Sequence, residues 1–332
     1  MPPRFRAADP SADLLAAQCN QLKPCRTRTE SATMPALMSV RSPAATSHSI
    51  DHDIETARAH PSVRAIVIPP CPDSLVRLQE IASAPELDSQ ALEQLASSDV
   101  AMAAAVIRTA NSPLYALAQP VQTVGMALTV LGLQPALELL SAFITRNALH
   151  VRTPLLEHFW ESSQRKAIAC EHIGRQLYSF DPGLGYSFGL FCHVGMPVLV
   201  KAVRGYAGTV TEALARKDRT FTQTENAAHR TDHAVMGAIV ARTWHLPPDV
   251  AQAIWLHHDF SCLSDERFDA TVRHLVALGL LAEFLVHHHE NLTPTREWTL
   301  HGQACMDHLY VTQVELNHWI DELYPAFEAV AL

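Results

Sequence analysis

Apolar residues recur at helical spacing along most of the chain, and no stretch alternates apolar and polar residues for long enough to predict a strand. After Pro72, three apolar residues follow at intervals of three, at Leu75, Leu78 and Ile81. This spacing predicts an amphipathic helix that ends before Pro85, because the residue that precedes a proline is pushed out of the helical region.

A second helix is predicted after Ser98, whose hydroxyl is suited to cap its first turn. Pro113 then ends this helix near Asn111. The residues expected on its apolar face are Val100, Ala103, Ala104 and Ile107. Because most of these side chains are small, the face would let another helix approach closely.

Two further helices are predicted on either side of Gly132, with Thr123 as the cap of the first and Pro135 in the first turn of the second. A helix, a turn and a helix can read DNA, but a recognition helix needs basic side chains to meet phosphates. Between residues 134 and 150 the only arginine is Arg146, and Glu138 offsets it. The charge pattern therefore argues against DNA recognition by this segment.

From residue 154 onward the apolar pattern predicts longer helices with histidines spread among them. Pro197 is expected to kink the second of these, and two short helices are expected after Asn291. The predicted long helices are 155–180, 186–203, 231–246, 247–258 and 269–289. The chain as a whole is therefore predicted to be all-α.

Composition agrees with a large helical core, since 48% of the 332 residues are hydrophobic and only 12 are glycine. The formal net charge of -9 opposes binding to nucleic acid, and only residues 1–33 carry an excess of basic side chains, 5 - 3 = +2. The seven cysteines form no C-x-x-C pair, which indicates reduced thiols and no thiolate zinc site. We expect no membrane span and no signal peptide, and hence a cytoplasmic protein.

Several segments, taken in order, resemble the HDOD domain family, the degenerate relatives of the HD phosphohydrolases in bacterial signalling proteins. The most specific are "DVAMAAAVIRTANSPLY", the "LGL" turn, "FWESSQ", "GLFCHVGMPVL" and "DHAVMG". The resemblance implies a multi-helix fold in which an N-terminal helical subdomain packs on an HD-like helical bundle. The expected division is a disordered arm at 1–60, the N-terminal subdomain at 61–150, the HD-like subdomain at 151–290 and a helical tail at 291–332.

The resemblance also implies where metal ligands would lie in an enzyme of this type. Ser162 takes the position of one metal-binding histidine, and Val194 that of the aspartate of the His-Asp pair. A serine hydroxyl is a poor ligand, and valine cannot bridge two cations. The positions that keep a ligand side chain are His193, His233, His257 or His258, and Glu283.

Each remaining histidine also has a structural explanation that needs no metal. His193 lies in an apolar stretch, where a hydrogen-bonded neutral ring can serve packing. His257 and His258 end a predicted helix, and histidine there satisfies free carbonyl groups. The run 287–289 is expected to be solvated near a helix end. No metal or cofactor is therefore expected, and a single ion, if bound, would use His193, His233 and His257.

The sequence thus favours a non-catalytic regulatory module that binds other proteins, and the resemblance implies two-component or cyclic-di-GMP-linked control. One alternative is a sensor that holds a nucleotide or another small ligand in the former HD pocket. A metal-dependent phosphohydrolase is less favoured, since two ligand positions are lost together. We also expect no nucleophilic catalysis by Cys192 with its neighbour His193, because adjacent helical residues point in different directions.

Overall fold

The protein is all-helical in a computed structural model that describes residues 47–149, 151, 153, 156, 158–216 and 218–330. The described residues contain no strand, and they belong to one compact unit, Arg41–Leu332. The helices are α1 Ser47–Ala59, α2 Pro61–Arg64, α3 Asp73–Ala82, α4 Ser89–Ser97, α5 Val100–Ala110, α6 Val124–Leu131, α7 Leu133–Ala148, α8 Phe159–Gln176, α9 Pro182–Phe191, α10 Gly195–Ala202, α11 Tyr206–Ala215, α12 Phe221–His229, α13 His233–Thr243, α14 Pro248–Leu256, α15 Ala270–His289, α16 Arg296–Leu309 and α17 Gln313–Val330. Short 3₁₀ turns lie at Pro113–Tyr115 and Phe260–Ser264.

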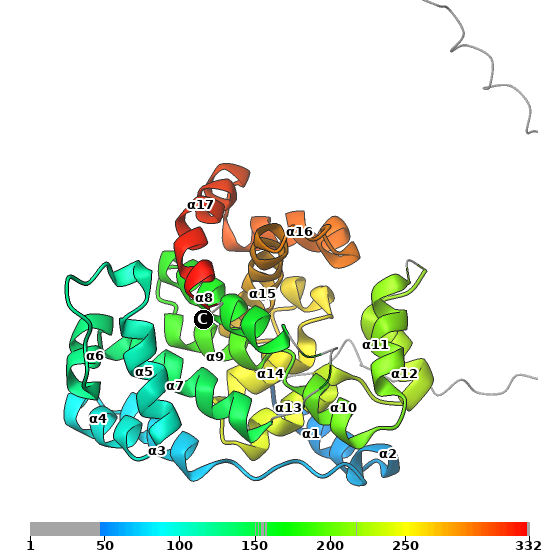
Figure 1. Cartoon of the computed structure of the whole chain (residues 1–332). Coiled ribbons are helices and arrows are strands. Elements are labelled where there is room, and N and C mark those ends of the chain that lie inside the picture. Colours follow the sequence, from blue (N-terminus) through cyan, green and yellow to red (C-terminus); the bar gives the residue numbers. More distant parts are fainter. Residues whose placement is uncertain are drawn as a thin grey trace, which may run out of the picture. The chain divides into compact units, whose positions relative to one another are not determined.

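The first half of the fold is a group of short helices, α3 to α7, in which α4, α5 and α6 contact one another (Figure 1). α6 and α7 meet at an angle of 113° at Gly132, whose φ of 86° is one that residues with a side chain rarely adopt. Thr123 caps α6 by accepting a hydrogen bond from the Met126 amide, as predicted. The turn at Gly132 lets α7 pack on α3, α4 and α5 and also contact α8.

The buried face of α5 differs from the predicted one. Its buried residues are Met102, Ala105, Val106 and Ala110. Val100 is instead 87% exposed, and the N-cap is Asp99 in place of Ser98, with its carboxylate accepting hydrogen bonds from two amides. The helix is rich in alanine all round, so spacing alone could not distinguish the two faces.

The predicted disordered arm, residues 1–60, is too long at its C-terminal end. α1 is a helix whose Ile50 and Ile54 side chains are each only 1% exposed, and it packs on α13 and α14 of the HD-like half. Two apolar residues four positions apart were too weak a signal in the sequence. The remainder of the predicted arm, residues 1–46, lies outside the described residues.

The HD-like half is built on α8, which packs along α9 and α15, with α13 and α14 beside α9 and α10 (Figure 1). The predicted helix 186–203 is in fact two helices, α9 and α10, that are interrupted at residues 192–194. Pro197 causes no kink, because it lies in the first turn of α10, where a missing amide proton is tolerated. The interruption places His193 between two helices.

Close approach of backbones holds α10 against α13. A Cβ atom on Gly195 would lie 2.1 Å from the carbonyl oxygen of His233, so only glycine fits at this contact. Asp232 caps α13 as predicted, since its carboxylate accepts a hydrogen bond from the Val235 amide. The side chain of Asn226 donates to the same carboxylate at 2.6 Å and ties α12 to the start of α13.

The predicted helical tail is part of the folded unit. α16 packs on α15, and α17 packs on α8 and α15 (Figure 1). Phe327 near the end of α17 is only 2% exposed, and its carbonyl oxygen accepts a hydrogen bond from Arg165 of α8.

Two stretches are long and apolar enough to cross a membrane, although the sequence led us to expect none. They are 182–202, which includes α9 and α10, and 270–289, which is α15, each with a mean hydropathy of 1.4. Counting the bent pair of α6 and α7 as one span would make three. Most of the two stretches is buried among the other helices, 67% and 61% respectively, and helices in a protein core are also apolar on all sides.

Candidate functional site

A cluster of histidines lies at the centre of the HD-like half. His193 comes from the break between α9 and α10, His233 from the first turn of α13, and His257 and His258 from the end of α14. One nitrogen of each ring lies within 4.8 Å of the corresponding atom of the others. We call these residues the histidine cluster. Among the described residues, no other set of three or more His, Cys, Asp or Glu side chains is close enough to share one cation.

The ring nitrogens of the cluster make short contacts with one another. His233 Nε2 lies 3.2 Å from His257 Nε2 and 3.0 Å from His258 Nε2. The His193 ring lies beside those of His233 and His257, with centroids 5.3 and 5.2 Å apart. His233 and His257 are buried, while His193 and His258 are half-buried, so the cluster borders on solvent.

Acceptor groups hold the opposite nitrogens of three rings. His233 Nδ1 lies 2.8 Å from the carboxylate of Glu225 on α12, and His258 Nδ1 lies 2.8 Å from Glu297 on α16. His257 Nδ1 lies 2.7 Å from the carbonyl oxygen of Ile254. Because ionised carboxylates and carbonyl groups only accept, each Nδ1 must carry the proton. The ring orientations and tautomers are thereby fixed.

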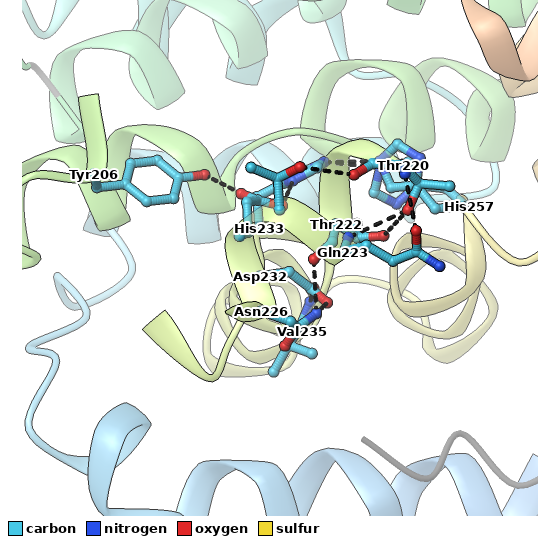
Figure 2. A network of polar contacts seen from close by, with 12 residues as sticks. Tyr206, Thr220, Thr222, Gln223, Asn226, Asp232, His233, Val235 and His257 are labelled. Carbon is cyan, nitrogen blue, oxygen red and sulfur yellow. Dashed lines mark hydrogen bonds and ion pairs between the residues drawn. The ribbon is translucent and has the colours of Figure 1, made fainter. Parts of the chain in front are cut away.

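Glu225 joins the cluster to a wider polar network. Its side chain is fully buried and also accepts a hydrogen bond from the hydroxyl group of Tyr206 on α11. Figure 2 shows Tyr206 and His257 on opposite sides of His233, with the capped starts of α12 and α13 between them. Burial and the neighbouring Glu225 raise the pKa of Tyr206, which stays a neutral donor. The network thus fixes the orientation of the His233 ring through its Nδ1 atom, on the side away from the other histidines.

Next to the histidine cluster lies a buried ion pair that the sequence did not reveal. Lys166 Nζ of α8 lies 3.2 Å from Glu283 Oε2 of α15, and Lys166 is only 5% exposed. Burial opposes the charge on Lys166, but the neighbouring Cys192 and Glu283 outweigh it and raise the pKa of the lysine. Burial likewise raises the pKa of Glu283, yet Lys166, together with His287 and His258, more than compensates and the net shift is downward. Both groups are therefore charged, and we call them the lysine pair.

Burial and neighbouring positive groups control the charge of the histidines. Burial is the main cause that lowers the pKa of His193 well below its ordinary value, and Lys166 adds to it. Burial and His258 lower the pKa of His257 well below its ordinary value in the same way. For His258, burial acts downward but Glu297 prevails, so its pKa is raised. His193 and His257 therefore present neutral rings.

The residues predicted for the HD pocket fall into two places. His193, His233, His257 and His258 converge, Val194 is fully buried beside His193, and Glu283 pairs with Lys166. Ser162 instead donates a hydrogen bond to Glu290 near the end of α15 at 2.6 Å, and Arg165 bonds the same carboxylate. The residue of α8 that lies near the histidine cluster is Lys166, one helical turn further on.

The run 287–289 does not converge on the histidine cluster, although His287 lies close enough to help lower the pKa of His193 and of Glu283. His287 lies 3.4 Å from the Thr293 carbonyl oxygen, and His289 pairs with Glu328, so the run 287–289 spreads over different neighbours. Burial raises the pKa of the Cys192 thiol to about 11 although Lys166 opposes it, which leaves Cys192 a poor nucleophile. A pocket of about 440 Å³ lies between α1, α2 and α13, and none of its lining residues belongs to the histidine cluster.

Three functional side chains were missed in the sequence. Lys166 lies four residues after Ser162 on the same helix, so it could have been considered as a neighbour on one helical face. Glu225 and Glu297 lie outside the motif segments and far along the chain from the histidines that they hold. Only the folded chain brings them together.

The fold and this arrangement of histidines define a helical protein of the HD-like class. The sequence pattern of the HDOD domain matches residues 68–260. The chain belongs to the HDOD domain family.

Solved structures agree on the fold. An HDOD domain protein of unknown function from Geobacter sulfurreducens has a TM-score of 0.67 at 21% identity, over 85% of this chain and 97% of the other. A protein from Marinobacter aquaeolei VT8, named for a proposed role in signal transduction, has a TM-score of 0.68 at 21% identity, over 88% of this chain and 67% of the other. One from Shewanella amazonensis SB2B, named for a proposed phosphohydrolase activity, has a TM-score of 0.61 at 18% identity, over 79% and 93%.

A curated relative is an uncharacterised protein of Treponema pallidum (strain Nichols), 23% identical over 202 residues. The alignment covers 60% of this chain but only 39% of that relative. At these levels of identity the likeness establishes the fold and leaves the activity open.

Proposed function

We propose that this HDOD protein is a non-catalytic signal-transduction module that acts by binding another protein. Two-component and cyclic-di-GMP-linked signalling proteins are the partners that we expect. Membership of the HDOD family supports a regulatory role, and the charges around the histidine cluster support the absence of phosphoester hydrolysis.

The observation that carries this proposal is the lysine pair beside a buried valine. Hydrolysis by two cations about 3.5–4 Å apart requires carboxylates that bridge or neutralise them. Val194 is fully buried where the enzymes place the aspartate, and it offers no donor atom. Glu283, the remaining carboxylate, is engaged by the ammonium group of Lys166 at 3.2 Å. A second cation would meet a positive charge at this position.

The surface supports binding to a protein. The segment from α5 to α6 exposes several large apolar side chains that a partner could cover. These are Val100, Leu114, Leu117 and Met126, which are 87%, 47%, 37% and 51% exposed. The contact surface is therefore proposed on the N-terminal half.

An assay of phosphoester turnover tests the non-catalytic part of the proposal. Protein without a histidine tag is incubated with bis-p-nitrophenyl phosphate and with cyclic di-GMP, in the presence of Mg²⁺, Mn²⁺, Zn²⁺ or Ni²⁺. We expect the same background for the wild type and for His233→Ala, because a contaminating enzyme would be unaffected by the substitution. Metal-dependent turnover that His233→Ala abolishes and the exposed control His318→Ala retains would show an enzyme.

Cross-linking in the source cells, followed by reconstitution, tests the binding part. A partner that is captured should re-form a complex with the purified chain on gel filtration, and Met126→Glu combined with Leu114→Glu should weaken it at least tenfold. Both residues are already exposed, so the control is that the variant unfolds at the wild-type temperature. If no captured protein re-forms a complex, a protein-binding role is excluded.

A further inference from the structure

The contacts within the histidine cluster leave lone pairs that face one another. His233, His257 and His258 each have a proton on Nδ1, which an acceptor fixes there, so each neutral ring carries a lone pair on Nε2. These Nε2 atoms are nevertheless only 3.0 and 3.2 Å apart. Two lone pairs at such distances repel unless a proton or a cation lies between them.

A single added proton resolves these contacts only if it is shared. A proton on His233 Nε2 would be divided between His258 Nε2 at 3.0 Å and His257 Nε2 at 3.2 Å, and His193 would take no part in this arrangement. A cation can instead accept one lone pair from each of the four rings at once.

The distances fit a small transition-metal ion. A zinc–nitrogen distance of about 2.0–2.1 Å in tetrahedral geometry gives nitrogen–nitrogen separations of about 3.3 Å. Two separations in the histidine cluster are 3.0 and 3.2 Å, and the ligand atoms all lie within 4.8 Å of one another. A small closure of the His193 ring toward the others would complete the set.

The donor atoms select the class of ion. Imidazole nitrogen suits Zn²⁺, Cu²⁺, Ni²⁺ and Co²⁺, whereas Mg²⁺ and Ca²⁺ require oxygen ligands. Glu225 and Glu297 do not face the centre of the cluster but hold the outer nitrogens of His233 and His258. Such carboxylate–histidine pairs orient metal-binding rings and strengthen them as ligands.

The lysine pair limits the site to one ion. Lys166 lies close enough to add to the positive field on His193 and His257, and its ammonium group engages the carboxylate of Glu283 at 3.2 Å. The positive charge of its ammonium group therefore neutralises Glu283, as a second metal ion would do in an enzyme with two cations.

We propose that the histidine cluster binds one late first-row divalent cation per chain, through one nitrogen of each of His193, His233, His257 and His258, and that Lys166 stands in for a second cation. The bound ion joins the α9–α10 break to α13 and α14, and through Glu225 and Glu297 it also fixes α12 and α16. Its role is conformational, because loading rigidifies five segments of the HD-like half.

The first test measures zinc stoichiometry and coordination. Protein without a tag is stripped with a chelator, dialysed and titrated with Zn²⁺ against a chromophoric competitor. We expect one ion per chain, a higher unfolding temperature on loading, and an X-ray absorption spectrum with nitrogen neighbours at about 2.0 Å and no sulfur. No binding, two ions per chain or a sulfur shell would overturn the proposal.

Matched variants separate this site from the other histidines of the chain. His233→Ala should remove the ion, whereas His318→Ala, at an exposed position, and the double substitution His287→Ala with His288→Ala should each retain one ion. Should His233→Ala fail to fold, His258→Asn at the half-buried edge serves instead. Zinc retained by the cluster variants but lost with His287 and His288 would assign the metal to the surface run.

Glu225→Gln tests the positioning role of the buried carboxylate. The amide can still accept a hydrogen bond, but it lacks the charge that strengthens His233 as a ligand. We expect zinc affinity to fall by about 10–100-fold, with the stoichiometry unchanged. An unchanged affinity would contradict the assignment of Glu225.

The outcomes distinguish this inference from the proposed function. Zinc binding without turnover supports both, and turnover that depends on bound zinc keeps the metal site while it overturns the non-catalytic proposal. A protein with neither zinc binding nor turnover leaves the regulatory module in place and removes the metal.

Discussion

The two sides of the central region of the HD-like half treat buried charge in opposite ways. On one side, the carboxylates of Glu225 and Glu297 lie behind histidines, and the ring nitrogens face inward. On the other side, the carboxylate of Glu283 meets the ammonium group of Lys166 directly. The first arrangement directs ring nitrogens toward the cation that we propose, whereas the second is already neutralised by the chain itself.

Under our two proposals, the pocket has lost phosphoester hydrolysis and has kept the binding of one cation. Loss of a ligand alone would leave Glu283 as an unpaired buried charge, which is costly. A lysine on the neighbouring helix removes that cost and stabilises the two helices against each other. The histidine side needs no such change, since neutral rings tolerate burial.

The largest expected effect comes from breaking the lysine pair. Lys166→Met keeps most of the side-chain volume but leaves Glu283 without its partner, so we expect the free energy of unfolding to fall by about 3–5 kcal/mol. Urea denaturation measures this loss. Adding Glu283→Gln should recover most of it, because removing both charges is far less costly than removing one. A double variant as unstable as Lys166→Met would mean that the ion pair is not the cause.

A smaller effect is expected from acid. The pKa of Glu283 lies below its ordinary value of 4.5 in the folded state, since Lys166 outweighs the effect of burial. The stability from this carboxylate is therefore present above that value and is lost as the pH falls through the lower folded pKa. Between about pH 5 and about pH 3, the wild type should lose more stability than the Lys166→Met, Glu283→Gln variant. Equal losses in urea titrations would contradict the assignment.

The smallest effect is expected at Ser162, which the sequence placed in the pocket and the structure places beside Glu290. Ser162→Ala should change the free energy of unfolding by about 1 kcal/mol or less, because Arg165 still bonds the same carboxylate. Zinc affinity should remain as in the wild type. A drop in zinc affinity would indicate that Ser162 is a ligand after all, and the histidine side would then not be the only part of the region that binds the cation.

Local patterns in the sequence were sufficient for most of the helices and for the histidines of the site. Asp232 as a cap and helical spacing after Pro72 both depend on residues a few positions apart, and so does the resemblance that pointed to His193 and His233. The break at residues 192–194 was missed, and the residue that follows it, Gly195, makes its close contact with a backbone 38 positions later, 233 - 195. Lys166 was missed for a related reason, since a lysine is no metal ligand and its meaning depends on Glu283 across the fold.

The contact at Gly195 gives the histidine cluster a mechanical basis. A carbonyl oxygen of α13 occupies the place where any other residue would carry its Cβ atom, at 2.1 Å. Because Gly195 has no Cβ atom, the two backbones can approach closely, and this contact helps to set the distance between His193 and His233. Gly195 itself lies two residues after His193. Gly195 therefore contributes to the geometry of the histidine cluster through the packing of two backbones, although it has no donor atom. A search for ligand side chains alone would not identify it as part of the site.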